Sequence, residues 1–298
     1  MSAEAGRSCV VVGLGPIGLS IARELGSRLA GGVELRSDAP DLGVPVWRSL
    51  AAAAGRAPIA VVTTGSRLPD VAPTIEEALG HGFHVVSTCE ELAFPWLGHA
   101  DLARDLDARA RAAGRVVLGT GVNPGFAMDR LVVTAARACV RVDGVEALRV
   151  VDLAARRDAL RRKIGCGLAE AAWREQDARG LMGHVGLAES AALVAVGLGW
   201  PHGEVACTLD PMVEAGFVRG SRQTASAAGG RVRLTLEMAL GPAEPRDELR
   251  VLGDPPIDLV VRGGIHGDRG TVGAVLDATA RVSALSPGLR SVLELTLR

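Results

Sequence analysis

The N-terminal part of the chain alternates short apolar runs with stretches whose apolar residues recur at helical spacing. Five runs rich in β-branched residues predict strands, at residues 8–13, 32–38, 58–65, 84–90 and 115–121. Helical stretches lie between them, at residues 14–30, in an alanine-rich segment before the third strand, and at residues 74–82 and 101–114. Strands that alternate with helices in this way predict a doubly wound parallel sheet of the α/β class, with right-handed crossovers.

The pattern changes after about residue 125. Longer strands are predicted in succession, interrupted by helical segments near 157–177 and 184–199: residues 145–154, 205–214, 231–240, 247–253 and 258–264. Residues 271–285 return to helical spacing. We therefore expect a first domain at residues 1–125, a second, α+β domain at residues 126–265, and a C-terminal segment, 266–298, that packs back on the first domain.

The net charge limits the kinds of partner that are expected, and the cysteine content limits the kinds of covalent and metal sites. The formal net charge is −1 and the pI is about 6.6, so no long-range field attracts nucleic acid or an anionic membrane, and we expect a small-molecule partner. The five cysteines are odd in number, widely spaced and never in C-x-x-C, which indicates neither a disulfide framework nor a metal site. No uninterrupted apolar segment has transmembrane length, and a cytoplasmic location is expected.

The turn after the first predicted strand has the G-x-G-x-x-G pattern of dinucleotide-binding domains. Gly13 permits a tight turn, Gly15 lets the backbone approach a pyrophosphate, and Gly18 allows close packing of helix on strand. Pro16 and Ile17 lie at the start of the helix, whose N-terminus stabilises the phosphate charge. The pattern predicts a Rossmann domain that binds NAD or NADP.

The end of the second predicted strand bears on the choice of dinucleotide. An acid there hydrogen-bonds the ribose 2′-hydroxyl of NAD, whereas an arginine accommodates the 2′-phosphate of NADP. If Ser37 is at the tip, Arg36 and Ser37 suit a phosphate; if Asp38 is there, the free hydroxyl is preferred. We slightly favour NADP, since Asp38 also suits a turn cap.

Ligands of doubly wound sheets bind beyond the carboxyl ends of the strands. At one such end, Thr63, Thr64 and Gly65 suit a loop laid against the cofactor. At another, Asn123 suits a loop amide that binds the nicotinamide carboxamide or the substrate, although it is equally a turn residue before Pro124.

Five segments, in order along most of the chain, carry a family resemblance. They are "STCEELAFPW", "GTGVNPGFAMDRL", "RKIGCGL", "HVGLAESAALVAVGLGW" and "GGIHGDRGTV…SPGL". Together they resemble the 2,4-diaminopentanoate dehydrogenase and native amine dehydrogenase family, a branch of the dihydrodipicolinate reductase-like proteins. The paired histidines and lysine-containing "PSGT" loop of true dihydrodipicolinate reductases are missing. The chain is short for the family, and Gly270 and Asp277 stand where the family tends to alanine and asparagine.

The resemblance implies NAD(P)-dependent oxidative deamination of an amine, or in reverse the reductive amination of a carbonyl with ammonia by hydride transfer to an iminium carbon. It also implies that a glutamate of "STCEE" is the acid/base. A carboxyl group partly buried near the nicotinamide can have its pKa raised toward the working pH. Of the two candidates, Glu90 lies nearer the strand end than Glu91, which suits a turn cap, so Glu90 is our first choice and Glu91 the second. The chain has no tyrosine to supply an alternative acid.

Two further residues are candidates for contact with the substrate. Phe126 follows the Asn123 loop closely enough to line an apolar pocket, and His266 lies in a glycine-flanked loop, although a structural histidine is the commoner case. We expect a homodimer formed through the sheet of the second, substrate-binding domain.

Two other functions remain open at this point. An imine or enamine reductase of a biosynthetic pathway has similar chemistry but does not bind ammonia. A non-catalytic dinucleotide-binding sensor has the same fold, and fold alone does not exclude it.

Overall fold

The computed structural model describes residues 7–36, 39–242 and 244–295. The chain divides into two compact units. Residues 1–126 and 266–298 form the first unit, and residues 127–265 form the second.

The first unit is built on a seven-stranded sheet in which every strand pairs parallel to its neighbours, in the order β13-β6-β5-β4-β1-β2-β3. Its strands are β1 (Cys9–Val12), β2 (Leu29–Val33), β3 (Val46–Trp47), β4 (Ile59–Val62), β5 (His84–Ser87), β6 (Val116–Gly119) and β13 (Gly288–Arg290). Its helices are α1 (Pro16–Leu25), α2 (Leu50–Ala53), α3 (Leu68–Gly80), α4 (Ala100–Ala112) and α9 (Gly267–Arg281). The doubly wound fold predicted from the sequence is confirmed.

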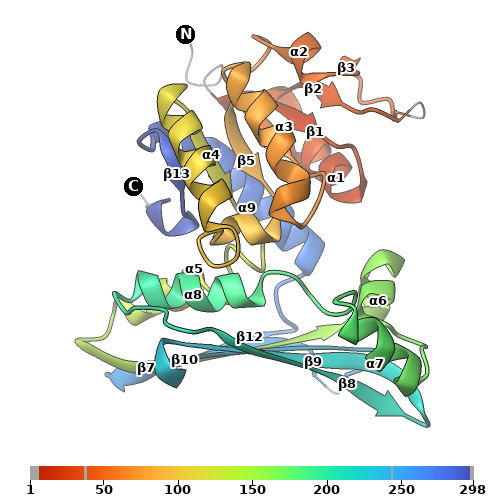
Figure 1. The fold of residues 1–298 in the computed structure, drawn as a ribbon, viewed down its shortest axis with the longest axis vertical. Coiled ribbons are helices and arrows are strands. Elements are labelled where there is room, and N and C mark those ends of the chain that lie inside the picture. The colour runs from red at the N-terminus through yellow and green to blue at the C-terminus, as the bar shows by residue number, and fades with distance from the viewer. Residues whose placement is uncertain (1–6, 37–38, 243, 296–298) are drawn as a thin grey trace. The chain divides into compact units, whose positions relative to one another are not determined.

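The core of the first unit lies on both faces of this sheet. All residues of β1, β4, β5 and β6 are buried, as expected for parallel strands covered on both sides. Helices α3 and α4 pack together on one face, and α1 and α9 pack together on the other (Figure 1). The sheet thereby holds the carboxyl ends of β1, β4, β5 and β6 side by side.

Some element boundaries differ from those predicted. Helix α3 begins at Leu68 rather than at residue 74, because Pro69 lies in the first turn, where its missing N–H is not needed, and burial of the apolar face supports the helix past Pro73. Strand β2 ends at Val33, well before residue 38. The short strands β3 and β13 carry too little apolar pattern to be predicted.

The second unit is a six-stranded mixed sheet in the order β12-β11-β7-β10-β9-β8. Its strands are β7 (Arg141–Asp152), β8 (Ala206–Glu214), β9 (Phe217–Ala227), β10 (Val232–Ala239), β11 (Arg246–Asp254) and β12 (Ile257–Arg262). Its helices are α5 (Arg130–Ala136), α6 (Asp158–Ile164), α7 (Glu170–Ala178) and α8 (Leu187–Gly197). Strand β9 was not predicted, because small and charged residues break its alternation.

One face of the six-stranded sheet is covered and the other is not. Helix α8 packs on β9 and β10, and α5 packs on β7 and β11 (Figure 1). The strands alternate accordingly: Val145 and Ala147 of β7 are buried, while Glu146 and Leu148 lie on the opposite side, where no helix is found among the described residues. The α+β architecture expected for this part of the chain is therefore confirmed.

Short 3₁₀ helices complete the described chain. They are η2 (Gly26–Arg28), η3 (Glu90–Ala93), η4 (Leu153–Ala155), η5 (Ala228–Gly230), η6 (Val282–Ala284) and η7 (Val292–Glu294). Within the described residues, no helix combines the length and apolar character needed to span a membrane.

Buried His84 makes the first unit sensitive to acid. Its Nδ1 accepts a hydrogen bond from the Val116 N–H at 3.2 Å, and burial, with a smaller contribution from the Arg115 charge, lowers the pKa of His84 from 6.5 to about 4. The unfolded chain therefore binds a proton that the folded chain does not, and stability falls as the pH drops from 6.5 toward 4. Between pH 7 and pH 5, we expect a loss of about 2 kcal/mol from this group.

Urea unfolding at the two pH values measures that loss. The variant His84→Asn keeps an acceptor near Val116 but does not titrate in this range, so its free energy of unfolding is expected to change less between pH 7 and pH 5 than that of the wild type. Equal changes in the free energy of unfolding of the two proteins contradict the assignment of this pH dependence to His84.

Candidate active site

The carboxyl ends of four neighbouring strands meet at one edge of the first unit. The residue that follows each of three strands donates its N–H to a carbonyl on the strand beside it in the sheet, at that strand's last residue. The bonds run from Thr63 to Val12 at 2.9 Å, from Thr88 to Val62 at 3.0 Å, and from Thr120 to Ser87 at 2.9 Å. The loops that begin at Gly13, Thr63, Thr88 and Thr120 therefore start in register, and this edge holds most of the side chains that the sequence selected.

The three glycines of the first loop have different surroundings. Gly13 has a φ of +86° and a Cβ there would lie 2.9 Å from Thr64 Cγ2. A Cβ on Gly18 would lie 2.0 Å from the Gly13 carbonyl oxygen, so helix α1 packs directly on the loop. A Cβ on Gly15 would meet no atom within 4 Å, and the backbone is open to an approaching ligand.

The start of α1 is suited to an anion. Gly15 is the N-cap residue and provides no side-chain hydrogen bond, and Pro16 follows it in the first turn. The N–H groups of Ile17 and Gly18 lie in the first turn of the helix, where N–H groups have no intrahelical acceptor. A helix N-terminus next to an open glycine fits the pyrophosphate of a dinucleotide.

Thr63, Thr64 and Gly65 extend this edge beyond β4. The Thr63 hydroxyl donates to the Gly13 carbonyl at 2.6 Å, so it fixes the glycine loop, while the Thr64 side chain is exposed. A Cβ on Gly65 would lie 3.1 Å from Val71 Cγ2, so the loop runs close to helix α3.

The residue at the tip of β2 is Glu34, which sequence reasoning missed. Its Oε2 accepts from the Leu14 N–H at 2.9 Å, and its Oε1 accepts from the Arg36 N–H at 3.1 Å. The Arg36 guanidinium also bonds Glu34 Oε2 at 3.0 Å and is the main reason why the pKa of Glu34 falls to about 2. The predicted strand ran too far, because the apolar Leu35, which is 79% exposed, extended the pattern.

Two of the residues on which the choice of dinucleotide depended lie outside the described part of the chain. They are Ser37 and Asp38. NADP was favoured on the assumption that the strand extends to Ser37, with Asp38 as a turn cap, whereas β2 ends at Val33 and Glu34 follows it.

The two adjacent glutamates after β5 have different surroundings. Glu91 is 5% exposed, and its carboxylate accepts hydrogen bonds from the Arg67 guanidinium at 2.8 Å, the Leu68 N–H at 2.6 Å and His99 Nε2 at 2.9 Å. Burial raises the pKa of Glu91, but these three bonds outweigh burial and lower it overall. Glu90 is only half-buried, at the start of the η3 turn.

Cys89, which precedes the two glutamates, has no feature of a reactive thiol. It is 1% exposed, and burial raises its pKa to about 12. The thiol is therefore protonated at neutral pH and acts as a small buried group.

The loop after β6 carries Asn123 and Phe126. Asn123 is 7% exposed, and the peptide bond to Pro124 is cis. Gly125 has a φ of +127°, and a Cβ there would lie 2.3 Å from the Gly121 nitrogen, so the loop closes tightly on itself. Phe126 is half-buried at its end. The same loop thus holds both residues, as expected.

His266 is the N-cap residue of α9. Its Nδ1 accepts a hydrogen bond from the Arg269 N–H at 3.3 Å, and its side chain is exposed. This capping contact is the structural role that the sequence left open beside substrate binding.

Within the described residues, no group of three or more histidine, cysteine, aspartate or glutamate side chains is arranged to hold a metal ion.

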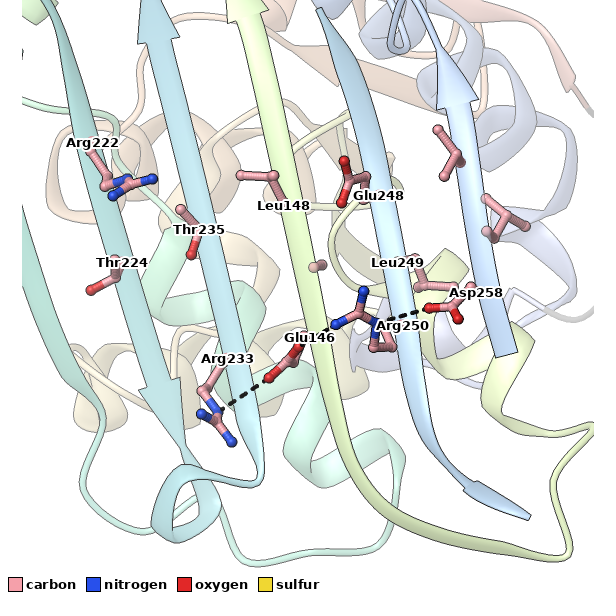
Figure 2. Close-up of a pocket in the computed structure, with 13 residues that line it drawn as sticks. Glu146, Leu148, Arg222, Thr224, Arg233, Thr235, Glu248, Leu249, Arg250 and Asp258 are labelled. Carbon is pink, nitrogen blue, oxygen red and sulfur yellow. Dashed lines mark hydrogen bonds and ion pairs between the residues drawn. The ribbon is translucent and has the colours of Figure 1, made fainter. Parts of the chain in front are cut away.

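A concave surface lies on the uncovered side of the six-stranded sheet, with a volume of about 540 Å³. Figure 2 shows its ion pairs, which run across four strands: Arg233 to Glu146 at 3.7 Å, Glu146 to Arg250 at 3.4 Å, and Arg250 to Asp258 at 2.8 Å. We call this surface the open face, and it comprises Glu146, Leu148, Arg222, Thr224, Arg233, Thr235, Glu248, Arg250, Asp258 and Val260. Its charges alternate in sign.

Comparison with known proteins gives a family match and a structural match. A model of the 2,4-diaminopentanoate dehydrogenase C-terminal domain matches residues 126–298. The 2,4-diaminopentanoate dehydrogenase of Acetoanaerobium sticklandii is 27% identical over 233 residues, which are 71% of this chain and 66% of that protein. The matched part therefore spans just under two thirds of that relative.

Solved structures share the fold at low sequence identity. An amine dehydrogenase from Mycobacterium smegmatis has a TM-score of 0.82 at 19% identity, covering 98% of this chain and 97% of that one. A probable dehydrogenase from Thermotoga maritima has a TM-score of 0.62 at 12% identity, covering 97% and 92%.

Proposed function

Because the chain belongs to the 2,4-diaminopentanoate dehydrogenase family, as its sequence motifs indicated, we propose that it is an NAD(P)-dependent amine dehydrogenase. The observation that carries the proposal is the pairing of an open dinucleotide loop at Gly15 with a half-buried carboxyl, Glu90, at the same sheet edge. The oxidative reaction converts a protonated primary amine, NAD(P)⁺ and water into a carbonyl compound, an ammonium ion, NAD(P)H and a proton.

The residues of the glycine loop bind the cofactor and orient it. Gly13, Gly15 and Gly18 shape the backbone against the pyrophosphate, and the N-terminus of α1 stabilises its charge. Thr63 keeps the loop in place through the Gly13 carbonyl. When bound, the nicotinamide supplies the hydride acceptor or donor.

Glu90 moves the protons of the reaction. In the amination direction, ammonia adds to the carbonyl carbon, and the carbinolamine loses water to form an iminium ion, which then accepts hydride. The Glu90 carboxyl donates the proton that leaves with the water, and as carboxylate it takes up the proton lost by the attacking ammonia. Asn123, Phe126 and His266 are proposed to contact the substrate, and Asn123 also the cofactor.

Panels of amines test this function. We expect NAD(P)⁺ reduction with at least one primary amine, with equal amounts of NAD(P)H, carbonyl product and ammonium ion formed. Dinucleotide binding without turnover across amines, ketones and preformed imines identifies a sensor instead.

Glu34 is proposed to select NAD over NADP. A carboxylate at the tip of β2, next to the glycine loop, accepts hydrogen bonds from a ribose diol and repels a 2′-phosphate. We expect NADH to bind more tightly than NADPH by roughly tenfold, a difference of about 1.4 kcal/mol in binding free energy. Fluorescence titration of both coenzymes measures the ratio, and Glu34→Gln, which removes the charge but keeps the size, should lower it.

Arg36→Ala is the matched variant that tests whether Arg36 favours the binding of NADPH. Because Arg36 places a positive charge beside Glu34, in an ion pair of 3.0 Å, its loss should weaken NADPH more than NADH. A wild-type protein that prefers NADPH, or a ratio unchanged in Glu34→Gln, overturns the assignment of Glu34.

The protein is further proposed to form a homodimer through the open face. Its alternating charges are self-complementary, so two copies related by a two-fold axis can pair each arginine with an acid of the other copy. Light scattering should give twice the mass of the chain, and a monomer mass excludes the dimer.

The five free cysteines suit a reducing cytoplasm, the location that we propose.

A further inference from the structure

The η3 turn, which carries Glu90, is attached on two sides. On one side, the Glu91 N–H donates to the Ser66 carbonyl at 3.3 Å and the Cys89 thiol donates to the same oxygen at 3.2 Å. On the other side, a Cβ on Gly119 would lie 2.6 Å from the Leu92 carbonyl carbon, so β6 and the turn are in direct backbone contact. Only a glycine at 119 permits this approach.

The Glu91 carboxylate joins three elements at this turn. It binds the Leu68 N–H at the start of α3, the Arg67 guanidinium just before that helix, and His99 Nε2 at the start of α4. His99 is the N-cap residue of α4, but its side chain makes no capping bond. An anion at a helix N-terminus is stabilised by the helix dipole as well as by its hydrogen bonds.

Burial along the turn follows from these attachments. Glu91, Leu92 and Ala93 are buried, and Glu90 alone in the turn is half-buried. A carboxylate held by three donors has little freedom to shuttle protons, whereas it fixes the backbone of its neighbour.

We infer that Glu91, with His99 and Arg67, is a positioning group that holds the η3 turn so that Glu90 is presented at the strand edge. This inference rests on the proposed function of Glu90. Preorganised groups need no rearrangement at the moment of reaction, and small misplacements of a catalytic group cost large factors in rate. Glu91 is therefore needed for turnover without itself transferring a proton.

Kinetics of variants test the inference. Glu91→Gln and His99→Ala should lower kcat on the order of tenfold, with the Kd of the coenzyme unchanged. The solvent isotope effect on kcat should rise, because proton transfer by a misplaced Glu90 becomes slower than the other steps. His99→Gln retains an N–H donor toward Glu91 and should restore most of the rate. Arg109→Ala removes an exposed guanidinium that pairs with Asp105 on α4, and it should change neither kcat nor the isotope effect.

A second readout does not depend on amine turnover. Hydrogen exchange of the backbone N–H groups of residues 88–93 should speed up in Glu91→Gln and His99→Ala, with β13 unchanged. If the wild type oxidises no amine and this exchange pattern is found, the proposed function fails and the attachment of the turn stands. Exchange unchanged in both variants, or a loss in Glu91→Gln as large as in Glu90→Gln, overturns the inference.

Discussion

Glu90→Gln is expected to slow amination by roughly a hundred- to ten-thousand-fold, the range of general acid–base catalysis. Glutamine keeps the size of the side chain and most of its hydrogen bonds but does not exchange a proton. Binding of NAD(P)H should persist, because the glycine loop and the tip of β2 are untouched. Steady-state rates with saturating ketone and ammonium, together with coenzyme titration, measure the two effects separately.

Glu91→Gln is the adjacent control for this experiment. Because Glu91 is bonded to Leu68, Arg67 and His99, its replacement should cost far less than that of Glu90. If Glu91→Gln abolishes turnover while Glu90→Gln is mild, the two roles are reversed and the carboxylate mechanism stands. If both variants stay active, the proton is carried elsewhere, with His266 or water as the next candidates.

Asp247→Ala is expected to destabilise the protein by about 3–5 kcal/mol, the cost of leaving a buried charge without its partner. Asp247 of β11 lies directly opposite Arg149 of β7, and both its oxygens are 2.9 Å from Arg149 Nη1. The two residues are 6% and 3% exposed. They also hold Ile265, whose N–H donates to Asp247 at 2.7 Å and whose carbonyl accepts from Arg149.

An exposed ion pair in the same unit provides the comparison. Arg174→Ala removes the pair with Glu170 on α7, which is worth about 0–1 kcal/mol. The double variant Arg149→Met/Asp247→Leu should lose less stability than Asp247→Ala, since it leaves no unpaired charge. Urea unfolding measures all three, and a loss below about 1 kcal/mol in Asp247→Ala contradicts this assignment.

The parallel sheet was predictable because its strands are continuous apolar runs. Glycines and stretches of helical apolar spacing separate these runs along the chain. Strands β1, β4, β5 and β6 fall within the predicted ranges for that reason. Strand β13 is three residues long and is stabilised by pairing with β6, a contact between segments far apart in the chain. Local pattern does not contain such information. Strand β3 is two residues long and is stabilised by pairing with β2.

The candidate site was predictable where it depends on the conformation of one short segment. It was not predictable where it depends on contacts between separate helices and strands. The glycine loop is determined by backbone conformation, so its motif identified Gly13, Gly15 and Gly18. Glu34 was missed because exposed Leu35 made the strand look longer than it is. The difference between Glu90 and Glu91 comes from the starts of helices α3 and α4, whose contacts with the turn are not contained in the local sequence pattern.

The rate of NAD(P)H oxidation as a function of ammonium concentration, with a ketone at fixed concentration, tests the proposed activity most directly. The account predicts a rate that is negligible without ammonium, rises to saturation with it, and produces one amine per NAD(P)H consumed. Equal oxidation of NAD(P)H with and without ammonium, or turnover only of preformed imines that ignores ammonium, contradicts it.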